Sequence, residues 1–108
     1  MDNQLKRGVL DVCVLAATAR QDSYGYQIIR DVSSCVSISE STLYPILRRL
    51  EAAGQLTAYS VEHSGRLRKY YRITDDGRTR LREFAGEWSE IIKVVDFVKG
   101  EVQEDDEG

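Results

Sequence analysis

The feature that most constrains this chain is an apolar repeat near its C-terminus. The repeat alternates gaps of three and four positions through Leu81, Phe84, Trp88, Ile91, Val95, Val98 and Val102. A spacing kept over three heptads is typical of a coiled coil, in which one stripe of a helix packs against another helix. We therefore predict a long helix over residues 75–102, whose interface residues are Leu81, Phe84, Trp88, Ile91, Val95 and Val98. Residues 103–108, QEDDEG, are expected to form an acidic, disordered tail.

Residues 1–74 predict a small domain of three helices and a hairpin. Apolar spacing indicates a helix at about 4–19, with Leu5, Val9, Val12, Cys13 and Ala16 facing inward. A second helix at about 24–34 is expected to bury Tyr26, Ile29 and Val32. Beyond Gly54 the runs QLTAYSVEH and RKYYRIT are strand-like and are joined around Gly65. Three helices, a hairpin and a long helix predict an α+β, mainly α fold: a winged helix-turn-helix with a C-terminal dimerisation helix.

The third helix, which contains TLYPILRRLE (residues 42–51), has two unlike faces. Its apolar side holds Leu43, Ile46, Leu47 and Leu50. The other side holds Ser41, Thr42, Pro45, Arg48 and Arg49, with Tyr44 at the boundary. Because proline is tolerated only near a helix start, Ser39 or Ser41 is expected to cap this helix. A helix that buries one face and presents cations on the other suits the major groove of DNA, although arginine pairs are also common on a solvated surface.

The charge of the chain is unevenly distributed. The net charge is −3, but residues 1–80 carry 12 Lys and Arg against 9 Asp and Glu, whereas residues 81–108 carry 3 against 9. The hairpin concentrates cations near its tip in Arg66, Arg68 and Lys69, and Tyr70 is expected to share a face with Arg68. A cationic hairpin directly after a cationic helix predicts two contacts on one DNA duplex.

Three segments together resemble the PadR family of bacterial transcriptional regulators: YGYQIIRDV, STLYPILRRLEAAGQL and GRLRKYYRITDDGRTRL. The resemblance extends from about Leu10 to Leu81. It implies a homodimeric winged-helix repressor that binds an inverted-repeat operator in double-stranded DNA and responds to a small molecule. The residues implied in DNA binding are Ser41, Thr42, Tyr44, Pro45, Arg48, Arg49, Arg66, Arg68, Lys69 and Tyr70.

The single C-terminal helix is similar to that of the compact, multidrug-sensing branch of the family. Trp88 stands where those relatives carry an interfacial tryptophan, which implies a small aromatic effector bound between two copies of the chain. Phe84, Arg7 and Asp11 are further candidates for lining that site. Dimer packing alone is the other role open to Trp88.

Other classes of function fit the sequence less well. A winged helix that only binds proteins would suit the isoelectric point of about 5.2, but not the cationic hairpin. An enzyme is not expected, because the sequence has no Ser/His/Asp set, no phosphate loop and no paired carboxylates outside the tail. With one histidine and no His/Cys cluster, neither a metal nor a cofactor is expected.

Two further features bear on redox state and location. Cys13 and Cys35 are too few and too far apart in sequence for a disulfide framework, so both are expected to be small core residues, with a redox switch as the alternative. No apolar run approaches the length of a membrane span, and no signal-peptide pattern follows the N-terminus. A cytoplasmic protein with no membrane partner is therefore expected.

Overall fold

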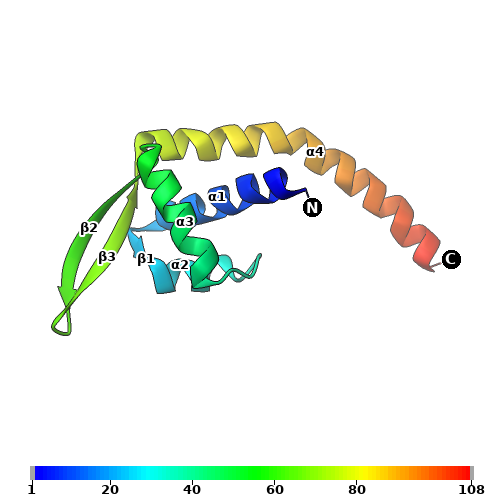
Figure 1. Cartoon of the computed structure of the whole chain (residues 1–108). Helices are drawn as coiled ribbons and strands as arrows, with labels where there is room; N and C mark the ends of the chain where they lie inside the picture. The colour runs from blue at the N-terminus through cyan, green and yellow to red at the C-terminus, as the bar shows by residue number, and fades with distance from the viewer. Residues whose placement is uncertain (1, 108) are drawn as a thin grey trace.

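The computed structural model describes residues 2–107, with side chains as far as Val102 (Figure 1). Its elements are α1 (Asn3–Arg20), β1 (Ser23–Tyr24), α2 (Gly25–Val32), α3 (Glu40–Ala52), β2 (Leu56–His63), β3 (Arg66–Ile73) and α4 (Asp75–Glu107). The strands form one antiparallel sheet in the order β1-β3-β2. This mainly helical arrangement confirms the predicted winged helix-turn-helix, and we call the hairpin of β2 and β3 the wing.

The hydrophobic core lies where α1, α2 and α3 meet the base of the sheet. The third helix buries the four residues predicted from its spacing, Leu43, Ile46, Leu47 and Leu50. Leu15 of α1, Ile28 of α2 and Leu56 of β2 are also almost completely buried. Tyr71 and Ile73 of β3 close the core from the sheet side.

The buried face of α1 is not the one predicted. The helix buries Leu10, Asp11, Val14, Leu15, Ala17 and Thr18. Of the predicted inner residues, Leu5 and Ala16 are exposed and Val9, Val12 and Cys13 are half-buried. The prediction was wrong because α1 is apolar on two sides, one of which packs on the core while the other faces α4.

In α2 the predicted inner position of Tyr26 was also wrong. The tyrosine is 69% exposed, whereas Ile28, which was not among the predicted residues, is completely buried. Val32 is buried as predicted, and Ile29 is half-buried. An eight-residue helix makes barely two turns, so its period is a weak guide to the face it buries.

The start of α3 follows the predicted capping. Ser39 is the N-cap, and its hydroxyl accepts a hydrogen bond from the Thr42 amide at 3.3 Å. This bond satisfies one of the amides that a helix start leaves without a partner. Pro45 then lies in the second turn of the helix, close enough to its start to be accommodated.

The wing is a regular two-stranded ladder with a two-residue turn. The strands pair from Leu56 with Ile73 to His63 with Arg66. Ser64 and Gly65 turn the chain with positive φ angles of 54° and 80°. The short strand β1 pairs with the other edge of β3 through Ser23 and Tyr71, which ties the wing to the helical core.

The long helix α4 runs alongside α1 and then extends past it (Figure 1). Its large exposed apolar residues are Ile91, Ile92, Val94, Val95, Phe97, Val98 and Val102. The helix continues to Glu107, beyond residue 102, where the predicted helix ended. The side chains of residues 103–107, and Gly108 altogether, lie outside the described residues, so the predicted disordered tail stays a prediction.

Candidate nucleic-acid interface

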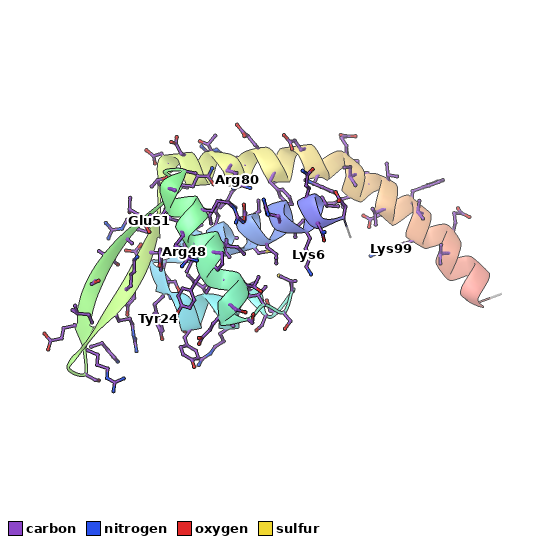
Figure 2. The ribbon with its side chains drawn as sticks, in the orientation of Figure 1. Lys6, Tyr24, Arg48, Glu51, Arg80 and Lys99 are labelled. Atoms are coloured by element: carbon purple, nitrogen blue, oxygen red, sulfur yellow. The ribbon has the colours of Figure 1, made fainter. Side chains whose placement is uncertain are left out.

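The outward face of α3 presents a row of polar and cationic side chains. Ser41, Thr42, Tyr44, Pro45 and Arg48 are all exposed, whereas the leucines between them point into the core. Figure 2 shows Arg48 on this face of the helix. The face is therefore free to meet a ligand as a rigid unit, since the buried stripe behind it fixes the orientation of the helix.

Arg49 differs from its neighbour Arg48 because it already has a partner. Its guanidinium forms a salt bridge with Asp11 of α1, and its side chain is 39% exposed. Successive helix positions point about 100° apart, so the second arginine turns from the outer face toward α1. The predicted pair of outward cations thus separates into one exposed arginine and one engaged arginine.

A groove of about 460 Å³ separates α3 from the wing. Its lining includes Tyr44 from α3 and Arg66, Arg68 and Lys69 from the wing. Gly25 also lines this groove, and a Cβ there would lie 2.9 Å from the Tyr44 hydroxyl, so a larger residue would require the Tyr44 side chain to shift. The structure therefore brings Tyr44 and the three predicted hairpin cations to one groove, whereas the other predicted residues of α3 do not line it.

The two faces of β3 carry different groups. Lys69 and Tyr71 lie on the face toward α3, where the Lys69 ammonium approaches the Glu51 carboxylate of α3 at 3.8 Å. Tyr70 and Arg72 lie on the opposite face by strand alternation, whereas Arg68, which alternation also directs to that face, still contributes to the lining of the groove at the edge of the strand. Lys69 consequently links the wing to the last turns of α3.

Tyr70 takes part in an aromatic cluster. Its ring stacks on Tyr59 at 5.7 Å and meets the edge of Tyr24 at 5.4 Å. The guanidinium of Arg68 lies 4.1 Å from the centre of the Tyr24 ring. Tyr70 is half-buried by these contacts, and sequence reasoning did not anticipate the cluster because Tyr24 and Tyr59 are distant in the chain.

Asp22 anchors the far side of that cluster. Its carboxylate accepts hydrogen bonds from Tyr59 Oη at 2.6 Å and from Arg72 Nε at 3.0 Å. These bonds, that of Arg72 foremost, hold the pKa of Asp22 below its ordinary value. The same contact with Asp22 raises the pKa of Tyr59.

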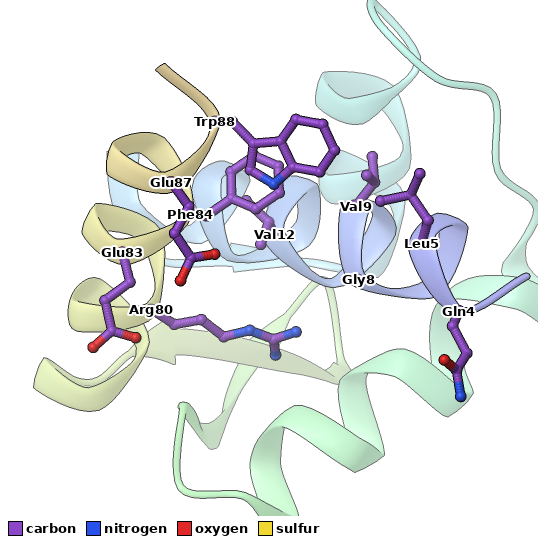
Figure 3. A pocket seen from close by; sticks show the side chains of 10 residues that line it. All are labelled: Gln4, Leu5, Gly8, Val9, Val12, Arg80, Glu83, Phe84, Glu87 and Trp88. Carbon is purple, nitrogen blue, oxygen red and sulfur yellow. The ribbon is translucent and has the colours of Figure 1, made fainter. Parts of the chain in front are cut away.

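A second hollow lies between α1 and α4 (Figure 3). It measures about 300 Å³ and is lined by Gln4, Leu5, Gly8, Val9, Val12, Arg80, Glu83, Phe84, Glu87 and Trp88. The rings of Phe84 and Trp88 pack against each other at 5.7 Å, tilted by 32°. The half-buried face of α1 that was mistaken for its core side is thus one wall of this cavity.

Two of the four predicted effector residues lie elsewhere. Arg7 lines a separate hollow with Thr42, Pro45 and Arg49 of α3. Asp11 does not line the cavity of Trp88 and Phe84, because its side chain is turned into the interior between α1, α3 and α4.

Asp11 of α1 connects this helix to both α3 and α4. Asp11 is only 4% exposed. One of its carboxylate oxygens forms a salt bridge with Arg49 of α3, and the other forms one with Arg80 of α4 at 3.2 Å. Sequence reasoning missed Arg80 and expected Asp11 to line the effector site. The available signal was an aspartate within the apolar run VLDVCVLAA, because a buried acid requires cationic partners.

Cys13 and Cys35, far apart in sequence, line one small hollow with Arg20 and Asp31. Cys13 is half-buried and Cys35 is exposed, so the expectation of two core residues was wrong for Cys35. Burial, and then the neighbouring Cys35 thiol, raise the pKa of the Cys13 thiol.

The described part of the chain contains no cluster of three or more His, Cys, Asp or Glu side chains that could hold a metal ion. Within the same residues, no helix has both the length and the apolar character needed to cross a membrane.

Comparison with known proteins assigns the chain to a family. Residues 14–83 match the model of the PadR-like family of transcriptional regulators. The transcriptional regulator Rv3488 of Mycobacterium tuberculosis is 31% identical over 93 residues, which cover 85% of this chain and 87% of that protein. The solved structure of smu.1704 from Streptococcus mutans superposes with a TM-score of 0.78 at 42% identity, covering 87% of this chain and 89% of the other.

A PadR family transcription regulator from Clostridium difficile gives a TM-score of 0.75 at 30% identity, with 82% of this chain and 96% of that chain covered. The family consists of regulators of transcription and not of enzymes. The sequence resemblance, the fold and these relatives agree: the chain belongs to the PadR-like family of transcriptional regulators.

Proposed function

We propose that this regulator is a homodimeric repressor that binds an inverted-repeat operator and is released by a planar aromatic ligand. The observation that carries the proposal is the groove between α3 and the wing, which is lined by Tyr44 of the exposed α3 face and by Arg66, Arg68 and Lys69 of the wing. In a winged helix-turn-helix, the corresponding helix enters the major groove and the wing meets the adjacent backbone.

In this arrangement different side chains of α3 make different contacts with DNA. Thr42 and Tyr44, near the helix start, reach base edges or phosphates, and Arg48 follows one turn later on the same exposed face. The wing cations contact phosphates and so add affinity without sequence preference. The acidic residues that make the whole chain negative are concentrated in residues 81–108, which belong neither to α3 nor to the wing.

Dimerisation through α4 would set the spacing of the two recognition helices. The exposed apolar stripe of α4 has the heptad spacing of a helix that packs on a second copy of itself. A two-fold dimer places two α3 helices in successive major grooves, about 34 Å apart, and therefore matches an inverted repeat.

The cavity between α1 and α4 is the proposed effector site. Phe84 and Trp88 offer flat apolar surfaces on which an aromatic ring can stack. Arg80, Glu83 and Glu87 provide hydrogen-bonding groups for the edge of the ring. The cavity lies between α1 and the proposed dimerisation helix α4. A ligand that binds more tightly to one arrangement of the dimer, with one spacing of its two α3 helices, would shift the DNA-binding equilibrium toward that arrangement.

DNA binding can be tested with a duplex that the protein selects from a random library, by fluorescence anisotropy at several salt concentrations. Arg48→Ala should weaken binding by about 1–3 kcal/mol and, if the arginine meets a phosphate, reduce the salt slope by about one. Arg82→Ala is the matched control, since Arg82 is exposed on α4 and remote from the groove. Selection of no duplex would instead favour a winged helix that binds only proteins.

Effector binding can be followed by the fluorescence of Trp88, the only tryptophan of the chain. Titration with planar aromatic cations, flavins and phenolic acids should give saturable quenching by a subset of them. The same compounds should release the selected duplex. Quenching without release would remove the effector role but leave DNA binding intact.

A further inference from the structure

We infer that Asp11 is a positioning residue for DNA binding: it holds Arg49 of α3, and Arg80 of α4 is the second cation that allows Arg49 to leave Asp11 for a DNA phosphate. The inference rests on the proposed function, because it assumes that α3 contacts DNA. It goes further by assigning a route from the α1–α4 cavity to the recognition helix.

The first step is the cost of a buried carboxylate. The Asp11 side chain is 6% exposed, whereas those of Arg49 and Arg80 are 39% and 32% exposed. A buried charge that loses its only partner destabilises a protein strongly. With two arginines on its two oxygens, Asp11 can release one and keep a counterion.

The second step concerns which arginine can leave. Arg49 lines a surface hollow together with Thr42 and Pro45, two residues of the outward face of α3. Its guanidinium therefore lies at the border between Asp11 and the proposed DNA surface. A phosphate there would compete with Asp11 for Arg49, while Arg80 stays on the carboxylate.

The third step places Arg80 under the control of the cavity. Arg80 lines the hollow of Phe84 and Trp88 (Figure 3). One of its terminal nitrogens donates to Gln55 Oε1 at 2.9 Å, and the other donates to Asp11. A hydrogen-bond acceptor on an occupant of the cavity would draw Arg80 away from Asp11. Arg49 would then be the only counterion of a buried acid, and its transfer to DNA would become unfavourable.

This coupling has a definite sign. Loss of Arg80 from Asp11 should lower DNA affinity, whether a ligand or a mutation causes it. Removal of the Asp11 charge should make DNA affinity independent of Arg80, since Arg49 is then free in either case. The two residues should therefore show strong non-additivity in a double-mutant cycle.

The experiment measures dissociation constants and salt slopes for the selected duplex with four full-length proteins: wild type, Arg80→Gln, Asp11→Asn and the double variant. Arg80→Gln should weaken binding about tenfold and reduce the salt slope by about one, as expected for one lost phosphate contact. In the Asp11→Asn background, Arg80→Gln should change neither quantity.

Two controls separate the role of charge from structural damage. Arg80→Lys keeps the cation and should retain affinity, and Gln55→Ala removes the hydrogen bond to Arg80 but not its charge. Circular dichroism and thermal melting confirm that each variant is folded. An Asp11→Asn variant that does not fold would be replaced by Asp11→Ser in the same cycle.

Additive effects of Arg80→Gln and Asp11→Asn, or an unchanged salt slope in Arg80→Gln, would overturn the inference while leaving the proposed function in place. If wild-type protein selects no duplex at all, the proposed function itself fails. The two failures are therefore distinguished by the wild-type measurement alone.

Discussion

Gly77, in the first turn of α4, shows how a single residue joins the wing to the long helix. It is buried, and its amide donates to Thr74 Oγ1 at 3.2 Å. A Cβ at this position would meet the Gln55 carbonyl oxygen and would lie 2.6 Å from Cγ1 of Ile73. The Gln55 carbonyl oxygen belongs to the backbone and cannot move aside as the end of a flexible side chain can, so the junction requires glycine at position 77.

We expect Gly77→Ala to lower the free energy of unfolding by about 1–3 kcal/mol, as overpacking of a close contact does. Gly86→Ala is the matched control, because a Cβ at Gly86 meets nothing within 4 Å. In the middle of a helix that change should raise stability by up to about 1 kcal/mol. Urea denaturation of both variants measures the difference, and equal effects would contradict the packing argument.

At the scale of elements, the cluster around Asp22 ties the loop after α1 to both strands of the wing. Because Arg72 and then Tyr59 lower the pKa of Asp22, the folded chain favours the carboxylate form. The resulting stabilisation is fully present above the ordinary pKa of 3.8 and is lost as the pH falls through the lowered value.

The Asp22→Asn variant should accordingly melt at a lower temperature than wild type near neutral pH, and the two should converge in acid. Thermal melting over a series of pH values measures this convergence. Glu62→Gln, on the exposed outer part of the same hairpin, removes a carboxylate and should leave the melting temperature nearly unchanged at every pH. A pH-independent difference for Asp22→Asn would indicate that the carboxylate charge is not what stabilises the wing.

The elements also differ in how far the sequence predicts them. The buried face of α3 was predicted because its four apolar residues lie on one side and polar residues lie on the other. The apolar residues of α1 lie on two sides, and periodicity cannot tell which side packs on the core and which lines a cavity. Only the positions of α3 and α4 decide this.

The candidate site shows the same limit at single positions. Sequence patterns predicted a cationic helix beside a cationic hairpin, and one groove is lined by Tyr44 of the helix and by three cations of the hairpin. They could not separate Arg48 from Arg49, because the partner of Arg49 lies 38 residues away in the chain. They also could not bring Arg80 to Asp11, since that contact depends on the three-dimensional packing of α1 against α4.

At the scale of the whole molecule, the single chain is elongated, with extents of 61 × 26 × 24 Å. The length comes from α4, whose second half extends beyond α1 (Figure 1). Seven large apolar residues of α4 are exposed. Exposed apolar surface of this extent is typical of an interface. The heptad spacing of part of it favours a second copy of the same helix as the partner.

We expect the double substitution Val95→Glu and Val98→Glu to convert a dimer into monomers, because each would place an uncompensated carboxylate in the apolar seam. Lys93→Glu introduces the same side chain two positions before Val95, about half a turn around the helix, and should leave the dimer intact. Sedimentation velocity at micromolar concentration separates the two states. A dimer that survives the double substitution would place the interface outside the predicted seam.

The double variant Val95→Glu and Val98→Glu also tests how dimerisation contributes to DNA binding. In a dimer, binding of the first recognition helix holds the second one near its own half-site at a high effective concentration. A monomer can contact only one half-site at a time. The double variant should therefore bind a full inverted repeat on the order of a hundredfold more weakly than wild type, while its affinity for an isolated half-site stays close to that of one wild-type subunit. Fluorescence anisotropy with full-site and half-site duplexes measures both affinities. Loss of dimerisation alone lowers the affinity only for a duplex in which two half-sites are joined. An equal loss of affinity for the full-site and half-site duplexes would therefore mean that the substitutions damage α3 or the wing.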